Sequence, residues 1–206
     1  MRKENLAKLL ILTMFLSIGM EAKADTQADL VFRTSVPKAT AIRNLLKGAA
    51  PITVNPETGA LTGGTLAAEF QLDSNATDES QTFVMTSSVQ TQSGNVSGYD
   101  SSGNLLFTNI NNLPTSEDIS DALSHGGYNR NVIVYPVTVT TSSPLTSAFQ
   151  AGHATYGNCY VININGAETG TVTQTVNASP VANTFHKTRD TAGTYQAVIT
   201  LTAVPD

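Results

Sequence analysis

The residues best able to do chemistry are a single cysteine and the histidine that lies nearest to it. Cys159 follows His153 within the stretch GHATYGNCY, and a nucleophilic cysteine requires a histidine nearby as its base. Such a pair also requires a third group that orients the base, and the sequence supplies none at a recognisable spacing. We therefore predict that Cys159 is a buried small hydrophobic residue, without a partner for an intrachain disulfide.

The three histidines do not predict a metal site. His125, His153 and His186 fall in three separate predicted loops, and no two of them have the spacing of metal ligands. The sequence also lacks the G-x-S-x-G motif of hydrolases and any glycine-rich loop for phosphate. We expect no catalytic residues, no metal and no cofactor.

An acidic cluster lies in residues 115–123, TSEDISDAL, which predict a short helix with Ser116 as its cap. Its members are Glu117, Asp118 and Asp121. Paired carboxylates of this kind can hydrolyse glycosides. Acids in a first helical turn also interact favourably with the helix dipole, and we favour this interpretation.

The first 24 residues predict a cleavable export signal. Three basic residues open the chain: Arg2, Lys3 and Lys8. The apolar run at residues 9–20 is too short to span a bilayer, and Ala22-Lys23-Ala24 matches a cleavage site. We expect the mature chain to begin at Asp25 and to be exported through the inner membrane into the periplasm.

The charge of the chain argues against two classes of partner. It carries 16 acidic and 11 basic residues, and four of the basic but only two of the acidic residues lie in the signal. The mature chain is therefore strongly acidic, which disfavours binding to nucleic acid or to anionic lipid.

A predicted strand follows the signal directly, in residues 28–36, ADLVFRTSV. Apolar residues and one threonine alternate with Asp29, Arg33 and Ser35, which predicts a strand with one face for burial. Pro37 ends this strand, because proline cannot donate to a ladder. The strand either folds back onto its own domain or pairs with another chain.

The remainder predicts an all-β fold, an antiparallel Ig-like sandwich with Greek-key connections and one or two very short helices. Residues 39–47 are expected to form a helical turn or an irregular crossover, residues 92–98 a loop and residues 142–157 an irregular connection. Pro136 should make residues 131–141 an edge strand or mark a bulge within them. The expected strands are residues 52–54, 66–72, 82–90, 105–110, 131–141, 158–164, 170–176 and 194–204.

Both ends of the chain resemble subunits of chaperone–usher pili. The tail AGTYQAVITLTAVPD is similar to their last strand, which a glycine opens about fourteen residues from the end; Gly193 lies there in this chain. The head, with its signal, alternating strand and Pro37, looks like that of alpha-type fimbrial major subunits. The absence of a cysteine pair also suits that type, whereas Pro205 stands where many pilins carry an aromatic residue.

The resemblance implies a structural pilus subunit that lacks one strand of its sandwich and polymerises by donor-strand exchange on the bacterial surface, in support of adhesion. It implies a signal at residues 1–24, a donor-strand extension at 25–37 and a pilin domain at 38–206. Its partners would be other pilus subunits, a periplasmic chaperone, an outer-membrane usher and a host-surface receptor.

The same resemblance assigns roles to two sets of residues. The donor strand would insert Ala28, Leu30, Phe32, Thr34 and Val36. The last strand would line the groove and face the chaperone with Gly193, Tyr195, Ala197, Ile199, Leu201 and Ala203. Two alternatives stay open: a secreted or surface β-sandwich binding module, such as a tip adhesin or a carbohydrate-binding domain, and an exported hydrolase.

Overall fold

The computed structural model describes residues 33–45, 52–77, 79–124 and 130–204. The chain divides into two compact units, Met1–Val36 and Pro37–Asp206. The described residues of the first unit, 33–36, are exposed and carry no helix, strand or turn. Every strand and the one helix of the described residues belong to the second unit.

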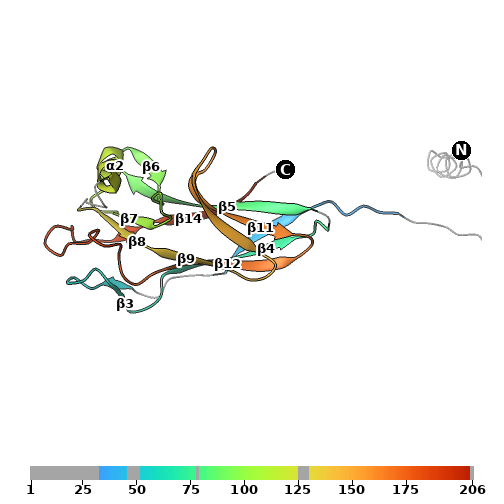
Figure 1. Ribbon diagram of the computed structural model, residues 1–206, viewed down its shortest axis with the longest axis horizontal. Helices are drawn as coiled ribbons and strands as arrows, with labels where there is room; N and C mark the ends of the chain where they lie inside the picture. The colour runs from blue at the N-terminus through green and yellow to red at the C-terminus, as the bar shows by residue number, and fades with distance from the viewer. Residues whose placement is uncertain (1–32, 46–51, 78, 125–129, 205–206) are drawn as a thin grey trace, which may run out of the picture. The chain divides into compact units, whose positions relative to one another are not determined.

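Two antiparallel sheets form the body of the second unit (Figure 1). The first sheet has the order β1-β4-β12-β9, which are Thr40–Asn44, Ala67–Ser74, Thr169–Val176 and Val137–Thr141. The second sheet has the order β10-β11-β5-β14, which are Thr146–His153, Gly157–Asn165, Ser80–Thr91 and Val198–Ala203. A short strand, β6 (Gly94–Ser97), also pairs with β5.

Two smaller sheets and a helix complete the unit. The third sheet has the order β13-β7-β8, which are Tyr195–Gln196, Leu105–Asn109 and Val132–Tyr135. A separate hairpin joins β2 (Thr53–Val54) to β3 (Leu61–Thr62). The helix α2 (Ser116–Ser124) buries Ile119 and Ala122, and Ile119 packs into a cluster with Val89 of β5.

The main core lies where the first and second sheets bury their apolar faces. Its buried residues come from both sheets and one loop: Phe70, Leu72, Phe83, Met85, Leu145, Ile162, Ile164 and Val172. The twelve-residue strand β5 supplies Phe83 and Met85, both 0% exposed, and pairs with β11, β14 and β6. The predicted all-β antiparallel sandwich is therefore confirmed.

Two predicted irregular segments are strands. Residues 39–47 were expected to form a helical turn or a crossover, but Thr40–Asn44 is β1, in which Ile42 lies opposite Leu72 and packs on the core. Residues 142–157 contain β10, an edge strand whose apolar alternation is weak because only Phe149 is a large apolar residue. Ladder pairing with β4 and β11 overrides these weak local signals.

Two other predictions need adjustment. The predicted loop at residues 92–98 contains β6. The helix cap is Thr115 rather than Ser116: its hydroxyl accepts the N–H of Asp118 at 3.0 Å, and the Asp118 carboxylate accepts the N–H of Thr115 at 2.8 Å. This reciprocal arrangement is a capping box.

The two longest predicted strands both change sheet partway. The chain breaks at Pro136, so that β8 joins the third sheet and β9 becomes an edge of the first. It breaks again at Ala197, where β13 passes into β14. Pro136 was expected to make this segment an edge strand or to mark a bulge. The structure instead ends β8 before Pro136 and begins the edge strand β9 after it, because a proline lacks the N–H that a ladder needs.

Candidate functional site

The strand β14 has an edge that no strand covers in the described part of the chain. It pairs on one side with β5, from Val198 opposite Ser88 to Ala203 opposite Phe83. At the border of the first sheet lies β1, which contacts β14. Two sheet edges therefore meet along this side of the sandwich, and an edge of unpaired N–H and C=O groups is a template for another strand.

The side chains of β14 alternate strictly between two environments. Ile199, Leu201 and Ala203 are half-buried and pack against the main core, whereas Val198 and Thr200 are exposed. The incomplete burial of three apolar residues that face a core indicates that this edge of the sandwich is open.

Two apolar hollows lie beside the segment that leads into β14 and beside the start of β14. The larger has a volume of about 620 Å³ and is lined on one side by Gly193, Thr194 and Tyr195. The smaller, of about 260 Å³, is lined by Ala197 and Ile199. Leu66 and Phe107 line both hollows, so that the two hollows are neighbours. We call the two hollows and the half-buried face of β14 the apolar groove.

Of the predicted groove residues, the structure brings all six to this place. Gly193 and Tyr195 line the larger hollow. Ala197 and Ile199 line the smaller hollow. Leu201 and Ala203 lie on the half-buried face of β14. The opposite wall of the larger hollow was not predicted. It consists of the β2–β3 hairpin, with Ile52, Val54 and Leu61, together with Phe185.

Gly193 is required by a close approach of the backbone to Asn109. A Cβ atom at Gly193 would lie 2.7 Å from Nδ2 of Asn109, which is closer than real contacts allow, and the residue has a φ of +155°. Asn109 is fully buried, and its side-chain oxygen accepts the N–H of Asn111 at 2.9 Å. A glycine therefore lets the chain pass Asn109 as it enters the last strand.

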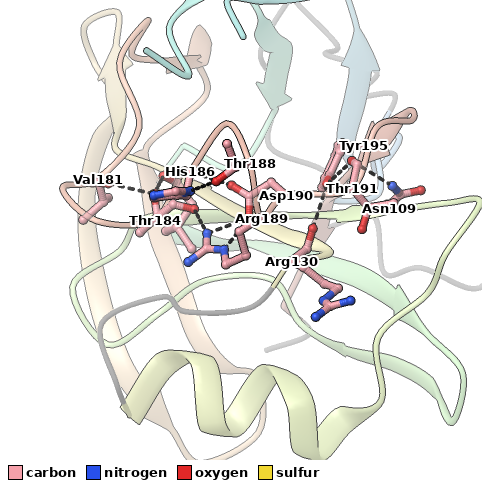
Figure 2. A network of polar contacts seen from close by, with 11 residues as sticks. Asn109, Arg130, Val181, Thr184, His186, Thr188, Arg189, Asp190, Thr191 and Tyr195 are labelled. Carbon is pink, nitrogen blue, oxygen red and sulfur yellow. Dashed lines mark hydrogen bonds and ion pairs between the residues drawn. The ribbon is translucent and has the colours of Figure 1, made fainter. Parts of the chain in front are cut away.

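The wall that carries Asp190 and Thr191 is held by a polar network (Figure 2). Asp190 accepts hydrogen bonds from Arg189 Nε at 2.7 Å and from the N–H of His186 at 2.6 Å. Tyr195 donates its hydroxyl to the carbonyl of Thr191 at 2.7 Å. His186 thus belongs to a turn that shapes the wall of the larger hollow.

The hairpin wall is attached to the same loop. The hydroxyl of Tyr135 donates to the carbonyl of Gly59 at 2.8 Å, and burial raises the pKa of Tyr135 to about 12. Lys187 forms an ion pair with Glu57. A Cβ at Gly59 would lie 2.5 Å from the ring of Phe185. These contacts fix the width of the larger hollow.

The candidate catalytic groups do not converge. Cys159 is 0% exposed in β11, and burial raises the pKa of its thiol, which disfavours the nucleophilic thiolate. Cys159 lies opposite Gln150 in the ladder, whereas His153 lies opposite Gly157 and accepts two backbone N–H groups of its own turn. The described residues contain no group of three or more potential metal ligands.

The predicted donor strand lies mostly outside the described residues, as does His125. Ala28, Leu30 and Phe32 are among the residues not described. Thr34 and Val36 are described and exposed, and Val36 is 81% exposed.

No protein-family model matches the chain, and no curated protein or solved structure matches it significantly. Among the helices of the described residues, none has the length and apolar character needed to cross a membrane.

The strand β1, which borders the open edge, is fastened by Asp73 of β4. The carboxylate accepts hydrogen bonds from Gln71 at 2.9 Å and from Thr169 at 2.8 Å, and Arg43 of β1 approaches it at 3.4 Å. The hydrogen bonds from Gln71 and Thr169, with a smaller contribution from Arg43, lower the pKa of Asp73.

We expect Asp73→Asn to weaken the fold only where the carboxylate is charged. A lowered pKa in the folded state stabilises above the pKa of the unfolded chain, and this contribution disappears as pH falls through the folded value. The unfolding free energy of Asp73→Asn should therefore lie below that of the parent at pH 6, and this difference should shrink as pH falls below the usual value of 3.8. Urea titrations at pH 6 and at about pH 3 test this, with exposed Glu168→Gln as the control. A difference as large at the lower pH as at pH 6 would contradict the assignment.

Proposed function

We propose that this chain is a structural subunit of a chaperone–usher pilus, which polymerises on the bacterial surface by donor-strand exchange and supports adhesion. The observation that carries the proposal is the apolar groove beside the edge of β14 that none of the described strands covers. Five alternate residues from Tyr195 to Ala203 face this groove or the core beneath it. The proposal gives the chain no enzymatic role.

The proposed occupant is residues 28–36 of a second copy. An added strand gains main-chain hydrogen bonds along the free edge, and its alternate side chains enter the hollows. In an antiparallel arrangement, which is slightly the more stable per residue, Val36 would lie at Tyr195, Phe32 at Ile199 and Ala28 at Ala203. Each of the five donor residues would then lie opposite one of the five groove residues.

This contact joins two different surfaces of the same chain. Such a heterologous contact does not close on itself and generates a fibre. Before assembly, a strand of a periplasmic chaperone would cover the same groove, and an outer-membrane usher would exchange it for the next subunit. The predicted export signal and the absence of cysteine pairs suit this route.

The test compares the mature chain from Asp25 with a chain that lacks residues 25–36. We expect the mature chain to form SDS-resistant ladders that collapse to monomer on heating, and the shortened chain to form none. Ladders of equal length from both chains would refute donation by this segment. Two stable monomers would refute the pilus proposal altogether.

The larger hollow favours a second candidate, a surface binding module. Lys187, Asp190 and Thr194 lie among the residues that line this hollow, so that a small ligand would find both apolar walls and charged groups. This candidate predicts a self-sufficient monomer that binds a ligand through the hollow and is indifferent to the loss of residues 25–36.

A further inference from the structure

The chain enters the sandwich at Pro37–Ala39, and one side chain holds both ends of this junction. Asn75 donates its side-chain N–H to the carbonyl of Pro37 at 3.0 Å, and its side-chain oxygen accepts the N–H of Ala39 at 2.7 Å. The backbone N–H of Asn75 also donates to the carbonyl of Ala39 at 3.2 Å. Between these residues, Lys38 forms an ion pair with Glu79. We call these five residues the junction clamp.

The clamp keeps the junction extended. The backbone bond from Asn75 to Ala39 continues the β1–β4 ladder beyond its last pair, Thr40 opposite Ser74. No turn occurs anywhere in residues 33–39. An asparagine suits this place because its amide supplies a donor for one carbonyl and an acceptor for one N–H at the same time.

The strand directions show what folding back would require. The start of β1 and the end of β14 lie at the same end of the sandwich, because Thr40 pairs with Ser74, Ala203 pairs with Phe83, and a short loop joins β4 to β5. Thus β1 and β14 run in opposite directions. A donor strand that turned back from β1 would pair with its own β14 in parallel.

Folding back also requires a tight turn within three residues. Only Pro37, Lys38 and Ala39 separate the end of the donor strand at Val36 from the start of β1 at Thr40. These are the residues that the clamp holds extended. A turn there would break both side-chain hydrogen bonds of Asn75.

We propose that the junction clamp prevents a subunit from filling its own groove and so directs its donor strand to a neighbour. Asn75 acts as the positioning residue. This inference rests on the proposed function, because it presupposes that residues 28–36 enter the apolar groove.

The test uses the mature chain, refolded at one fixed concentration, with Asn75→Ala and with Asn177→Ala as the matched control. Asn177 is also exposed and accepts one side-chain hydrogen bond, from Thr138. Size-exclusion chromatography measures the monomer fraction, and a fluorescent peptide of residues 28–36 reports whether the monomers have a free groove. We expect Asn75→Ala to cause at least a threefold rise in the fraction of monomers that do not bind the peptide. Asn177→Ala should leave this fraction unchanged.

A second measurement separates a loosened clamp from a damaged groove. In a full mature chain whose own donor strand is disabled by Phe32→Asp, adding Asn75→Ala should leave the affinity for the peptide unchanged. A loss of affinity there would overturn the proposal, because the groove itself would have changed. Polymer and monomer fractions equal to the parent's would overturn the clamp and leave the proposed function intact. A parent chain that neither polymerises nor takes up peptide would defeat both.

Discussion

Replacing Phe32 by aspartate is expected to abolish polymerisation of the mature chain and to leave the stability of its sandwich unchanged. Phe32 is the largest of the five proposed donor residues and would lie at Ile199 in the middle of the apolar groove. An ionised carboxylate placed there would lose its hydration without gaining a partner, at a cost of several kcal/mol. A loss of about 3 kcal/mol already lowers an association constant by roughly two orders of magnitude.

The matched control is Ser35→Asp, which introduces the same charge on the opposite face of the same strand. It should assemble as the parent does, because that face would not enter the groove. Sedimentation and SDS ladders measure assembly, and urea denaturation measures the sandwich. Equal loss of assembly in both variants would show that the added charge alone prevents assembly. Normal assembly of Phe32→Asp would show that Phe32 is not a buried donor residue.

Phe83→Ala is expected to lower the unfolding free energy by about 3–5 kcal/mol, the typical cost of removing a buried aromatic ring and leaving a cavity. Phe83 is 0% exposed, belongs to the main core, and lies on β5 opposite both Ala203 and Ile162. Its loss should therefore loosen the strand that forms one side of the groove as well as the core beneath.

Val198→Ala provides the comparison. Val198 lies on β14 and is 46% exposed, so this substitution removes few atoms and the side chain is already in contact with water. We expect this variant to lie within about 0.5 kcal/mol of the parent. Chemical denaturation of both variants measures the difference. A Phe83→Ala variant as stable as Val198→Ala would mean that the sheets do not bury this ring as described.

The strands with clear alternation are the part of the fold that the sequence predicts well. Alternating apolar residues in Leu66–Leu72 and in the last strand correspond to β4 and to β13–β14. β1 and β10 were missed because each presents only one large apolar residue, Ile42 or Phe149, to the interior. Such edge strands owe their structure to pairing with a neighbouring strand, β4 for β1 and β11 for β10, rather than to an apolar pattern of their own.

The candidate site, like the fold, could be predicted from the sequence only in part. One wall could be predicted because Tyr195 to Ala203 form one strand-like run whose spacing alone places them on one face. For the opposite wall, built from the β2–β3 hairpin and Phe185, the sequence predicted the strand at residues 52–54, but not its pairing with β3 or its place beside Phe185. Nothing local places Gly59 against Phe185 or Asn75 against Pro37, because these contacts depend on how the strands cross.

The most direct measurement is the thermal unfolding of the chain that lacks residues 25–36, with and without a synthetic peptide of residues 28–36. A ligand that binds only the folded state at 100 times its Kd adds about 2.7 kcal/mol. For a chain of this length, that corresponds to a rise of roughly 5–10 °C in Tm. We predict a saturable rise of this size, and none with the same peptide carrying Phe32→Asp. A shortened chain that is already stable, with a Tm that neither peptide changes, would contradict the account.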